Sequence, residues 1–174
     1  MTEQVSDRRT AAPAAVKIRA VSAAEVRPVR QRVLRPHQRE SALVYSGDAS
    51  PETLHVGAFV DGELVGIASI FLEPPEYNVH HPAAWRLRGM ATLPEYRARG
   101  LGRELLTACL RHASAESGRL AWCNARVSAI GFYRRMGFEQ LGAAFELPGI
   151  GPHVVMERPL QGFSGADRVF QQPA

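Results

Sequence analysis

The chain carries at its centre the stretch Met90-Ala91-Thr92-Leu93-Pro94-Glu95-Tyr96-Arg97-Ala98-Arg99-Gly100-Leu101-Gly102-Arg103. Before it, residues 85–90 alternate apolar and polar side chains, which is typical of a half-buried strand. After it, leucines, Cys109 and Ala113 recur at helical spacing up to Gly118. The pattern predicts a strand that runs through a glycine-containing turn into a helix.

The turn between this strand and this helix is suited to hold an anion. The first backbone N–H groups of a helix have no partner within the helix, and the helix dipole places its positive end there. Gly100 and Gly102 have no Cβ atom to hold a phosphate away from the backbone. Arg97, Arg99 and Arg103 add positive charge. We interpret the turn as a cradle for a pyrophosphate.

Two common phosphate-binding signatures are absent from this turn. No Gly-Lys-Ser/Thr ending follows it, and no Gly-x-Gly-x-x-Gly leads to an acidic residue at the spacing of a dinucleotide site. What remains is Arg97-x-x-Gly100-x-Gly102. Taken alone, this pattern fits a tight entry turn into a helix as well as it fits an anion site.

A second segment, residues 121–138, adds a motif of its own. It predicts a strand, a short helix that ends at Gly137, and a further strand that begins at Phe138. It contains Ala-x-x-x-Tyr-x-x-x-Gly-Phe from Ala129 to Phe138. Together the two segments resemble motif A and motif B of the GNAT superfamily of acyl-CoA-dependent N-acetyltransferases. The resemblance runs from about Val16 to Leu160 and is specific for the fold, much less so for the substrate.

The resemblance implies an α/β fold of the mixed α+β kind. Its centre would be a mixed, mostly antiparallel sheet of about six to seven strands, splayed between the fourth and fifth strands and flanked by helices. One N-acetyltransferase domain would cover residues 15–160, with flexible tails over 1–14 and 161–174. A length of 174 residues and a hydrophobic content of 45% agree with a single domain.

Local patterns predict the other elements. Ser22 is placed to cap a helix that begins near Ala23 and ends at Pro36. Asp61-Gly62 is a hairpin turn between two apolar runs. Between Arg39 and Pro51 we expect loop with some helix. The remaining expected strands cover residues 16–19, 54–60, 63–70, 139–147 and 153–158.

By the same resemblance, acetyl-CoA is the cosubstrate. The turn would hold its pyrophosphate, and a strand edge can pair with the amides of its pantetheine arm as an added strand would. A backbone N–H at Met90 would polarise the thioester carbonyl, and the slot would align this carbonyl with the amine. The expected contacts with acetyl-CoA are Met90, Ala91, Thr92, Arg97, Ala98, Arg99, Gly100, Leu101, Gly102, Arg103 and Asn124.

Tyr133 is the candidate side-chain catalyst. The departing thiolate gains from a proton, and a phenol with an ordinary pKa of about 10 is an adequate donor beside the sulfur. The matching tyrosine often has this role in the family. The alternative is that Tyr133 simply belongs to the buried face of its helix.

The acceptor amine must lose a proton before it attacks. Many relatives place a glutamate on the strand before motif B for this step, and the matching position here is Ala121. The motif B asparagine is also replaced, by Arg126, although Asn124 lies two residues earlier. Glu146 and His153 flank the last turn and are the substitute candidates, and a water chain is a third. Alternatively, Glu146 is a solvated strand residue and His153 a hydrogen-bonded histidine at a strand end.

The charged and sulfur-containing residues limit the partners. The net charge is +4, and five arginines cluster near the first predicted helix, at positions 27, 30, 32, 35 and 39. They form either a solvated helical face or a surface for an acidic partner. No basic aromatic strand or helix-turn-helix pattern indicates nucleic acid. His55 is expected to be structural, and no metal site is expected. Cys109 and Cys123 match no zinc spacing and suggest buried, reduced thiols.

The chain also contains no apolar run of membrane-spanning length and no secretory signal pattern. We therefore expect a cytoplasmic N-acetyltransferase, monomeric or homodimeric, that moves an acetyl group from acetyl-CoA directly to a primary amine. The acceptor, a small molecule or a protein amine, is left open. The alternative is a catalytically weak GNAT-like sensor or interaction module that binds acyl-CoA, which the missing glutamate supports.

Overall fold

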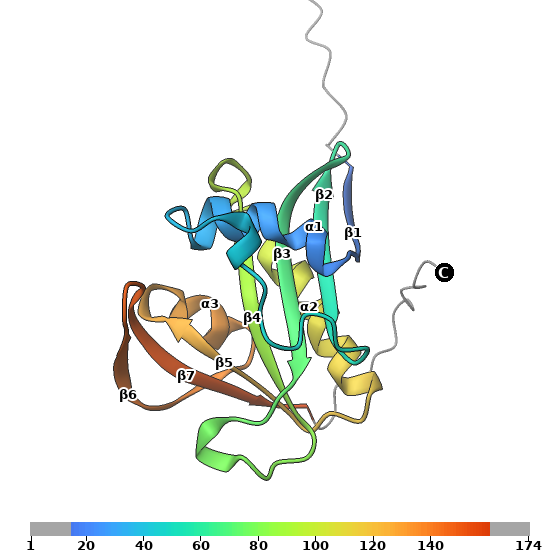
Figure 1. The fold of residues 1–174 in the computed structure, drawn as a ribbon. Helices are drawn as coiled ribbons and strands as arrows, with labels where there is room; N and C mark the ends of the chain where they lie inside the picture. Colours follow the sequence, from blue (N-terminus) through green and yellow to red (C-terminus); the bar gives the residue numbers. More distant parts are fainter. Residues whose placement is uncertain (1–14, 161–174) are drawn as a thin grey trace, which may run out of the picture.

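The computed structural model describes residues 15–160, so the two predicted tails, 1–14 and 161–174, lie outside the described residues. A seven-stranded sheet in the order β1-β2-β3-β4-β5-β7-β6 forms the centre (Figure 1). Its strands are β1 (Val16–Ala20), β2 (Leu54–Val60), β3 (Glu63–Leu72), β4 (Ala84–Thr92), β5 (Leu120–Arg126), β6 (Glu139–Leu147) and β7 (Gly151–Pro159).

The junction between β4 and β5 divides the sheet. All other neighbouring strands are antiparallel, whereas β4 and β5 are parallel. Their ladder has three residue pairs, from Ala84 with Leu120 to Arg86 with Trp122, and beyond it the two strands diverge (Figure 1). The predicted mixed sheet, splayed between its fourth and fifth strands, is confirmed.

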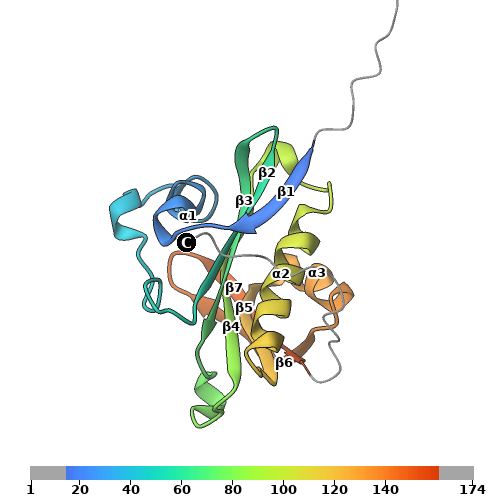
Figure 2. The same ribbon diagram turned by 90° about the vertical axis from the view of Figure 1, so that its right-hand side faces the viewer.

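Helices cover both faces of the sheet. Seen edge-on, α1 (Ala23–Val29) lies on one side, and α2 (Leu101–Ala115) and α3 (Ile130–Arg135) lie on the other (Figure 2). A π-helical turn, η1, continues α1. The short helices are η1 (Arg30–Leu34), η2 (Glu40–Ala42), η3 (Glu76–Asn78), η4 (Pro94–Tyr96) and η5 (Val127–Ala129).

The start of α1 follows its sequence signals. The Ser22 hydroxyl accepts a hydrogen bond from the Glu25 N–H at 3.2 Å, and the Glu25 carboxylate accepts one from the Ser22 N–H at 2.7 Å. This reciprocal capping box satisfies two N–H groups that the helix would otherwise leave unpaired. Beyond Pro28 the winding widens into η1 and ends at Leu34, two residues before the predicted stop at Pro36.

The apolar face of α2 forms much of the core against β2, β3 and β4. Each buried leucine there contributes about 1.5–3 kcal/mol of burial free energy. Trp85 is 2% exposed and packs edge-on against the His112 ring at 5.2 Å. Both cysteines are free and buried, as predicted, with Cys109 on α2 and Cys123 on β5. Burial raises the pKa of the Cys123 thiol to about 12.

Candidate active site

A β-bulge in β4 lies beside the gap between β4 and β5. Ser69 pairs with Arg88 and Ile67 pairs with Ala91, so one residue of β3 faces two residues of β4, Gly89 and Met90. Gly89 has a φ of +61°, a conformation that favours glycine. A bulge of this kind leaves one residue out of the ladder and redirects the strand.

A cavity of about 650 Å³ occupies the gap. This volume is within the usual range of small-molecule sites, roughly 300–1,000 Å³. The strands contribute Met90, Ala91 and Thr92 from β4 and Cys123, Asn124, Ala125 and Arg126 from β5. The helices contribute Leu34, Phe132 and Tyr133, the β6–β7 turn contributes Ile150, and β7 contributes His153.

The turn before α2 is strongly curved and ends in an open helix terminus. Ala98 and Gly100 both have positive φ, +59° and +81°. The helix begins at Leu101, and no side chain caps it. Its first N–H groups therefore face outward without a side-chain acceptor, which is the arrangement that favours an anion. Arg97 and Gly102 from this segment line the cavity.

The arginines of the turn make local contacts. Arg97 Nε donates to the Thr92 carbonyl at 3.3 Å. Arg99 donates to the Glu95 carbonyl at 3.0 Å, and the exposed Arg103 pairs with Glu104 at 3.4 Å. An exposed ion pair such as Arg103–Glu104 contributes less than about 1 kcal/mol, so Arg103 can exchange this partner for a stronger anion.

These features are shared with known proteins. The model of the Acetyltransferase (GNAT) family matches residues 21–138. The chain belongs to the GNAT acetyltransferase family. It is 39% identical over 147 residues to YitI of Bacillus subtilis, an uncharacterized N-acetyltransferase, which covers 84% of this chain and 97% of YitI. It is 35% identical over 101 residues to the N-alpha-acetyltransferase RimI of Mycobacterium tuberculosis, or 54% of this chain and 57% of RimI.

A solved structure agrees with this assignment. The GNAT acetyltransferase of Staphylococcus aureus Mu50 matches with a TM-score of 0.65 at 15% identity, over 84% of this chain and all of that chain (100%). At that identity the likeness establishes the GNAT fold. The predicted family membership is thus confirmed.

Tyr133 lies on the cavity wall with its hydroxyl inside the protein. The residue is 8% exposed, and its hydroxyl contacts the Met90 sulfur at 3.8 Å. Burial raises the pKa of Tyr133 well above its ordinary value of 10, and the neighbouring Cys123 raises it further. The phenol therefore stays protonated at neutral pH. Because a thioether is a weak acceptor, the hydroxyl loses little when it turns to a stronger one.

His153 lies opposite the end of β5 and also lines the cavity. It is 5% exposed, and its Nδ1 is 2.8 Å from the Gly151 carbonyl oxygen. A carbonyl only accepts hydrogen bonds, so Nδ1 must carry the hydrogen, which leaves the Nε2 lone pair free when the ring is neutral.

The other predicted site residues are distributed differently. Asn124 lines the cavity together with Met90, Ala91 and Thr92. Glu146 is exposed on β6 and pairs with Pro152, and it is not among the cavity-lining residues. Ala121, at the position of the usual glutamate, is fully buried in the core. The remaining predicted contacts with acetyl-CoA form the turn before α2 and the start of this helix but do not line the cavity: Ala98, Arg99, Gly100, Leu101 and Arg103.

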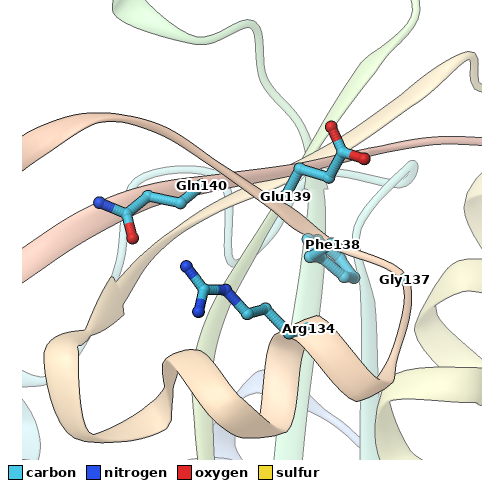
Figure 3. Close-up of a pocket in the computed structure, with 5 residues that line it drawn as sticks. All are labelled: Arg134, Gly137, Phe138, Glu139 and Gln140. Carbon is cyan, nitrogen blue, oxygen red and sulfur yellow. The ribbon is translucent and has the colours of Figure 1, made fainter.

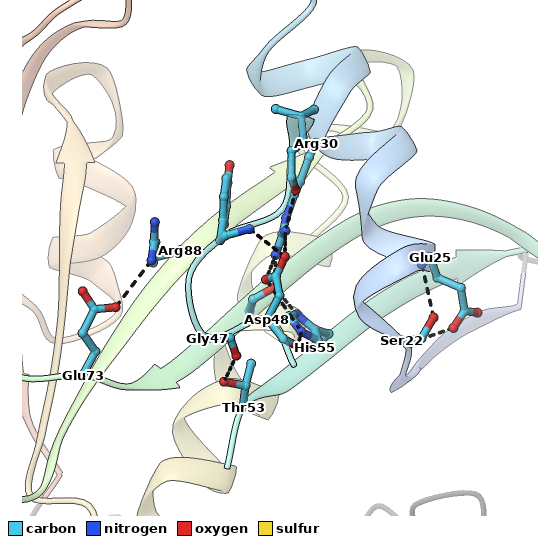
Figure 4. A network of polar contacts seen from close by, with 12 residues as sticks. Ser22, Glu25, Arg30, Gly47, Asp48, Thr53, His55, Glu73 and Arg88 are labelled. Carbon is cyan, nitrogen blue, oxygen red and sulfur yellow. Dashed lines mark hydrogen bonds and ion pairs between the residues drawn. The ribbon is translucent and has the colours of Figure 1, made fainter. Parts of the chain in front are cut away.

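A buried polar network next to the bulge was not predicted from the sequence. Arg30, in η1, is fully buried and forms two hydrogen bonds with the Asp48 carboxylate, at 2.6 and 2.9 Å (Figure 4). It also donates to the Ser69 hydroxyl at 3.2 Å. Arg30 therefore belongs neither to a solvated helical face nor to a surface for an acidic partner, the two alternatives predicted for the five arginines.

Two further groups complete this network. Burial disfavours the charged form of Asp48, but the hydrogen bonds from Arg30 and from the Tyr45 N–H hold its pKa below its ordinary value of 3.8. His55 contacts the Ser69 hydroxyl at 2.7 Å and the Asp48 carbonyl at 3.0 Å, which confirms its predicted structural role.

The network also explains why glycine stands at the bulge. A Cβ atom on Gly89 would lie 3.2 Å from Arg30 Nε and 3.3 Å from the Tyr45 ring. The buried arginine thus packs directly on the backbone of the bulge. No local sequence pattern indicates this contact, because the acid that pairs with Arg30 lies 18 residues away in a loop.

A second hollow, of about 400 Å³, lies between α3 and β6 and contains none of the predicted site residues (Figure 3). Its wall is made by Arg134, Gly137, Phe138, Glu139 and Gln140. Arg134 extends toward Gln140, whereas the Glu139 carboxylate points away from both (Figure 3).

Residues 15–160 contain neither a candidate metal site nor a candidate membrane-spanning helix. In this part of the chain, no three His, Cys, Asp or Glu side chains gather in a way that could hold a metal ion. None of its helices is long and apolar enough to cross a membrane.

Proposed function

We propose that this chain transfers an acetyl group from acetyl-CoA directly to a primary amine. The observation that supports this best is the cavity between β4 and β5, which has the open N-terminus of α2 beside it and the protonated Tyr133 on its wall. Membership of the GNAT family supports an acyl-CoA donor. The names of YitI and RimI, both N-acetyltransferases, support an amine acceptor.

The reaction follows from the layout of these groups. The first N–H groups of α2, with Arg97, would bind the pyrophosphate, and the β4 edge at Met90–Thr92 would pair with the pantetheine arm. The amine nitrogen attacks the thioester carbonyl, a C–N bond forms, and the C–S bond breaks. A base first takes the proton that the ammonium form of the acceptor must lose before attack. Tyr133 donates its proton to the departing thiolate, and the second proton, which the acetylated nitrogen releases, restores the phenol.

We assign the base to His153 rather than to Glu146. The Nε2 lone pair of His153 belongs to a cavity-lining side chain, whereas Glu146 is exposed outside the lining. His153→Gln should lower kcat/KM by about 10²-fold at neutral pH. The deficit should shrink as the pH rises, because more of the acceptor amine is then already unprotonated. An equal loss at every pH would argue against a base.

A second candidate function is an acyl-CoA-binding sensor with weak catalysis. The observation that favours it is the buried Ala121, which leaves the usual glutamate position without a base. The two candidates differ in turnover and share binding of acetyl-CoA. An assay of acetyl transfer to a panel of amines, in which the released CoA thiol is measured, separates the two candidate functions.

The first experiment is calorimetric titration with acetyl-CoA of the parent protein, Gly100→Asp and Gly142→Asp. Both glycines have positive φ, +81° and +73°, and a Cβ on either would meet no atom within 4 Å. The two variants therefore add the same charge and the same backbone strain. We expect Gly100→Asp alone to abolish binding, because its carboxylate stands where the pyrophosphate would bind. Equal binding by both variants would refute the assignment of the turn.

A further inference from the structure

The part of the cavity on the α1 side of the sheet is lined by cations. Arg88 comes from β4, Arg126 from the end of β5, and Arg35 follows η1. None of the described residues that line the cavity is an aspartate or a glutamate. We infer that the acceptor is a small amine that also carries a carboxylate, which Arg88 and Arg126 bind. The inference rests on the proposed acetyl transfer and names its substrate class.

The register of the sheet places these two arginines on one face. Arg86 and Trp122 are partners across the β4–β5 ladder and therefore lie on the same face of the sheet. Every second residue of a strand returns to the same face. Arg88, two residues after Arg86, and Arg126, four residues after Trp122, therefore lie on that face as well. Because β4 and β5 diverge beyond this pair, the two guanidinium groups flank the cavity from opposite strands.

Arg88 shares its neighbouring carboxylate with another arginine. Its guanidinium is 3.5 Å from Glu73, which lies closer, at 2.6 Å, to Arg86 (Figure 4 shows the pair of Arg88 with Glu73). One carboxylate therefore serves two cations. The Arg88 side chain is 24% exposed and lies over the rings of Tyr45 and Phe71, at 4.7 and 5.4 Å from their centroids. Burial lowers the pKa of Arg88, as does the charge of Arg86, whereas the charge of Glu73 opposes this shift.

Arg126 is available for a ligand. It is exposed at the end of β5, and its guanidinium has no hydrogen bond or ion pair within residues 15–160. It is the register partner of His153, so the two side chains emerge on the same face from adjacent positions. A carboxylate on Arg126 would thus hold the amine of the same molecule near the base proposed above.

The chemistry of the lining selects against other amines. An arginine binds a carboxylate through two parallel hydrogen bonds, and this geometry orients as well as attracts the ligand. A diamine or polyamine would instead bring a second cation among arginines, with no carboxylate on the cavity wall to balance it. The free amine of an amino acid or a similar amino carboxylate fits both requirements.

The test compares each amine with its own carboxamide. We would measure acetyl transfer to α-amino acids and to ω-amino acids of increasing length, to the matched carboxamides, and to simple diamines. The carboxamide has the less basic amine and so more free base at neutral pH, which biases the test against the inference. We expect kcat/KM at least about 10-fold higher for the best acid than for its amide.

Variants locate the effect. Arg126→Gln and Arg88→Met should each raise the KM of the preferred acid about 10-fold or more and reduce the acid-to-amide preference toward one, with the KM of acetyl-CoA little changed. Arg119→Gln is the matched control, because Arg119 is exposed just before the start of β5, at the opposite end from Arg126. Retained acetyl-CoA binding shows that the variants fold.

The possible failures are distinguishable. If the protein binds acetyl-CoA but acetylates amides or diamines as well as acids, or acetylates no amino carboxylate at all, the inference is overturned and the proposed transfer to another amine survives. An acid preference that Arg126→Gln and Arg88→Met leave intact also overturns it. If acetyl-CoA does not bind, the proposed function and this inference fail together.

Discussion

At the scale of single residues, Tyr133 combines the two properties that a proton donor to a thiolate needs. It lies on the wall of the cavity, and burial keeps its phenol protonated. Tyr133→Phe should lower kcat by about 10²-fold, the usual contribution of a positioned acid. The affinity for acetyl-CoA should stay within about 2-fold, because the partners of the hydroxyl in this structure, the Met90 thioether and the Cys123 thiol, are both weak hydrogen-bonding groups. An unchanged kcat would remove Tyr133 from the mechanism.

His55 makes stability depend on pH. Burial lowers its pKa below the ordinary value of 6.5, although the hydrogen bond to the Asp48 carbonyl and the charge of the Asp48 carboxylate oppose this shift. The unfolded chain therefore binds a proton more readily, and the free energy of unfolding falls as the pH drops from about 7 through the folded pKa. The slope attributable to His55 is at most about 1.4 kcal/mol per pH unit.

Urea denaturation between pH 7.5 and 5 measures this slope. His55→Gln should be less stable at pH 7.5, since it disturbs the contacts with Ser69 and Asp48, yet should show a flatter pH dependence. A slope equal to that of the parent protein would assign the pH dependence to other groups.

At the scale of elements, two neighbouring residues, Ser117 and Gly118, form the end of α2 in different ways. Ser117 has a φ of +60°, and its N–H and that of Gly118 bond back to the carbonyls of Ser114 and Ala113, at 3.1 and 2.7 Å. This is a Schellman ending with serine, rather than glycine, in the left-handed position. The sequence predicts that the helix runs up to Gly118, whereas the structure ends it at Ala115.

Ser117→Gly should therefore stabilise the protein by about 0.5–1 kcal/mol, because it removes the strain of a side chain at positive φ. Gly118→Ala should have the opposite effect, since its Cβ would lie 2.5 Å from the Ala113 carbonyl oxygen and 2.6 Å from the Trp85 ring. Thermal or urea unfolding of the two variants checks the pair. A loss of stability in Ser117→Gly would contradict this account of the ending.

The elements that sequence patterns predict well are those with local causes. The Asp61-Gly62 turn, with φ of +50° and +88°, joins the expected hairpin, and Ser22 caps the expected helix. The α1-side wall of the cavity could not be predicted in the same way. The burial of Arg30 and the shared carboxylate of Glu73 depend on residues that are distant in sequence and brought together only by the sheet.

At the scale of the whole molecule, the two parts of the sheet meet through few contacts. Strands β1–β4 and strands β5, β7 and β6 are joined across the three-pair ladder of β4 and β5. A ligand that binds in the gap would contact both parts and favour the folded state. At 100 times its Kd, acetyl-CoA should add about 2.7 kcal/mol of stability. For a chain of this size, this corresponds to a rise in Tm of about 5–10 °C.

Differential scanning calorimetry across a series of acetyl-CoA concentrations checks this expectation. Gly142→Asp should show the same rise in Tm and Gly100→Asp should show none, by the argument given for the turn. A rise of equal size in Gly100→Asp would place the ligand elsewhere on the protein.

The alkylation rates of the two buried thiols report how the molecule opens. Cys123 lies on the cavity wall and Cys109 within the core face of α2, and burial keeps both protonated and unreactive. A thiol-alkylating reagent can reach Cys123 once the two parts of the sheet separate, but it reaches Cys109 only after α2 leaves the sheet. The two alkylation rates therefore time two different motions, local separation and global unfolding, in the unmodified protein. Acetyl-CoA in the gap would slow the first rate at ligand concentrations near its Kd.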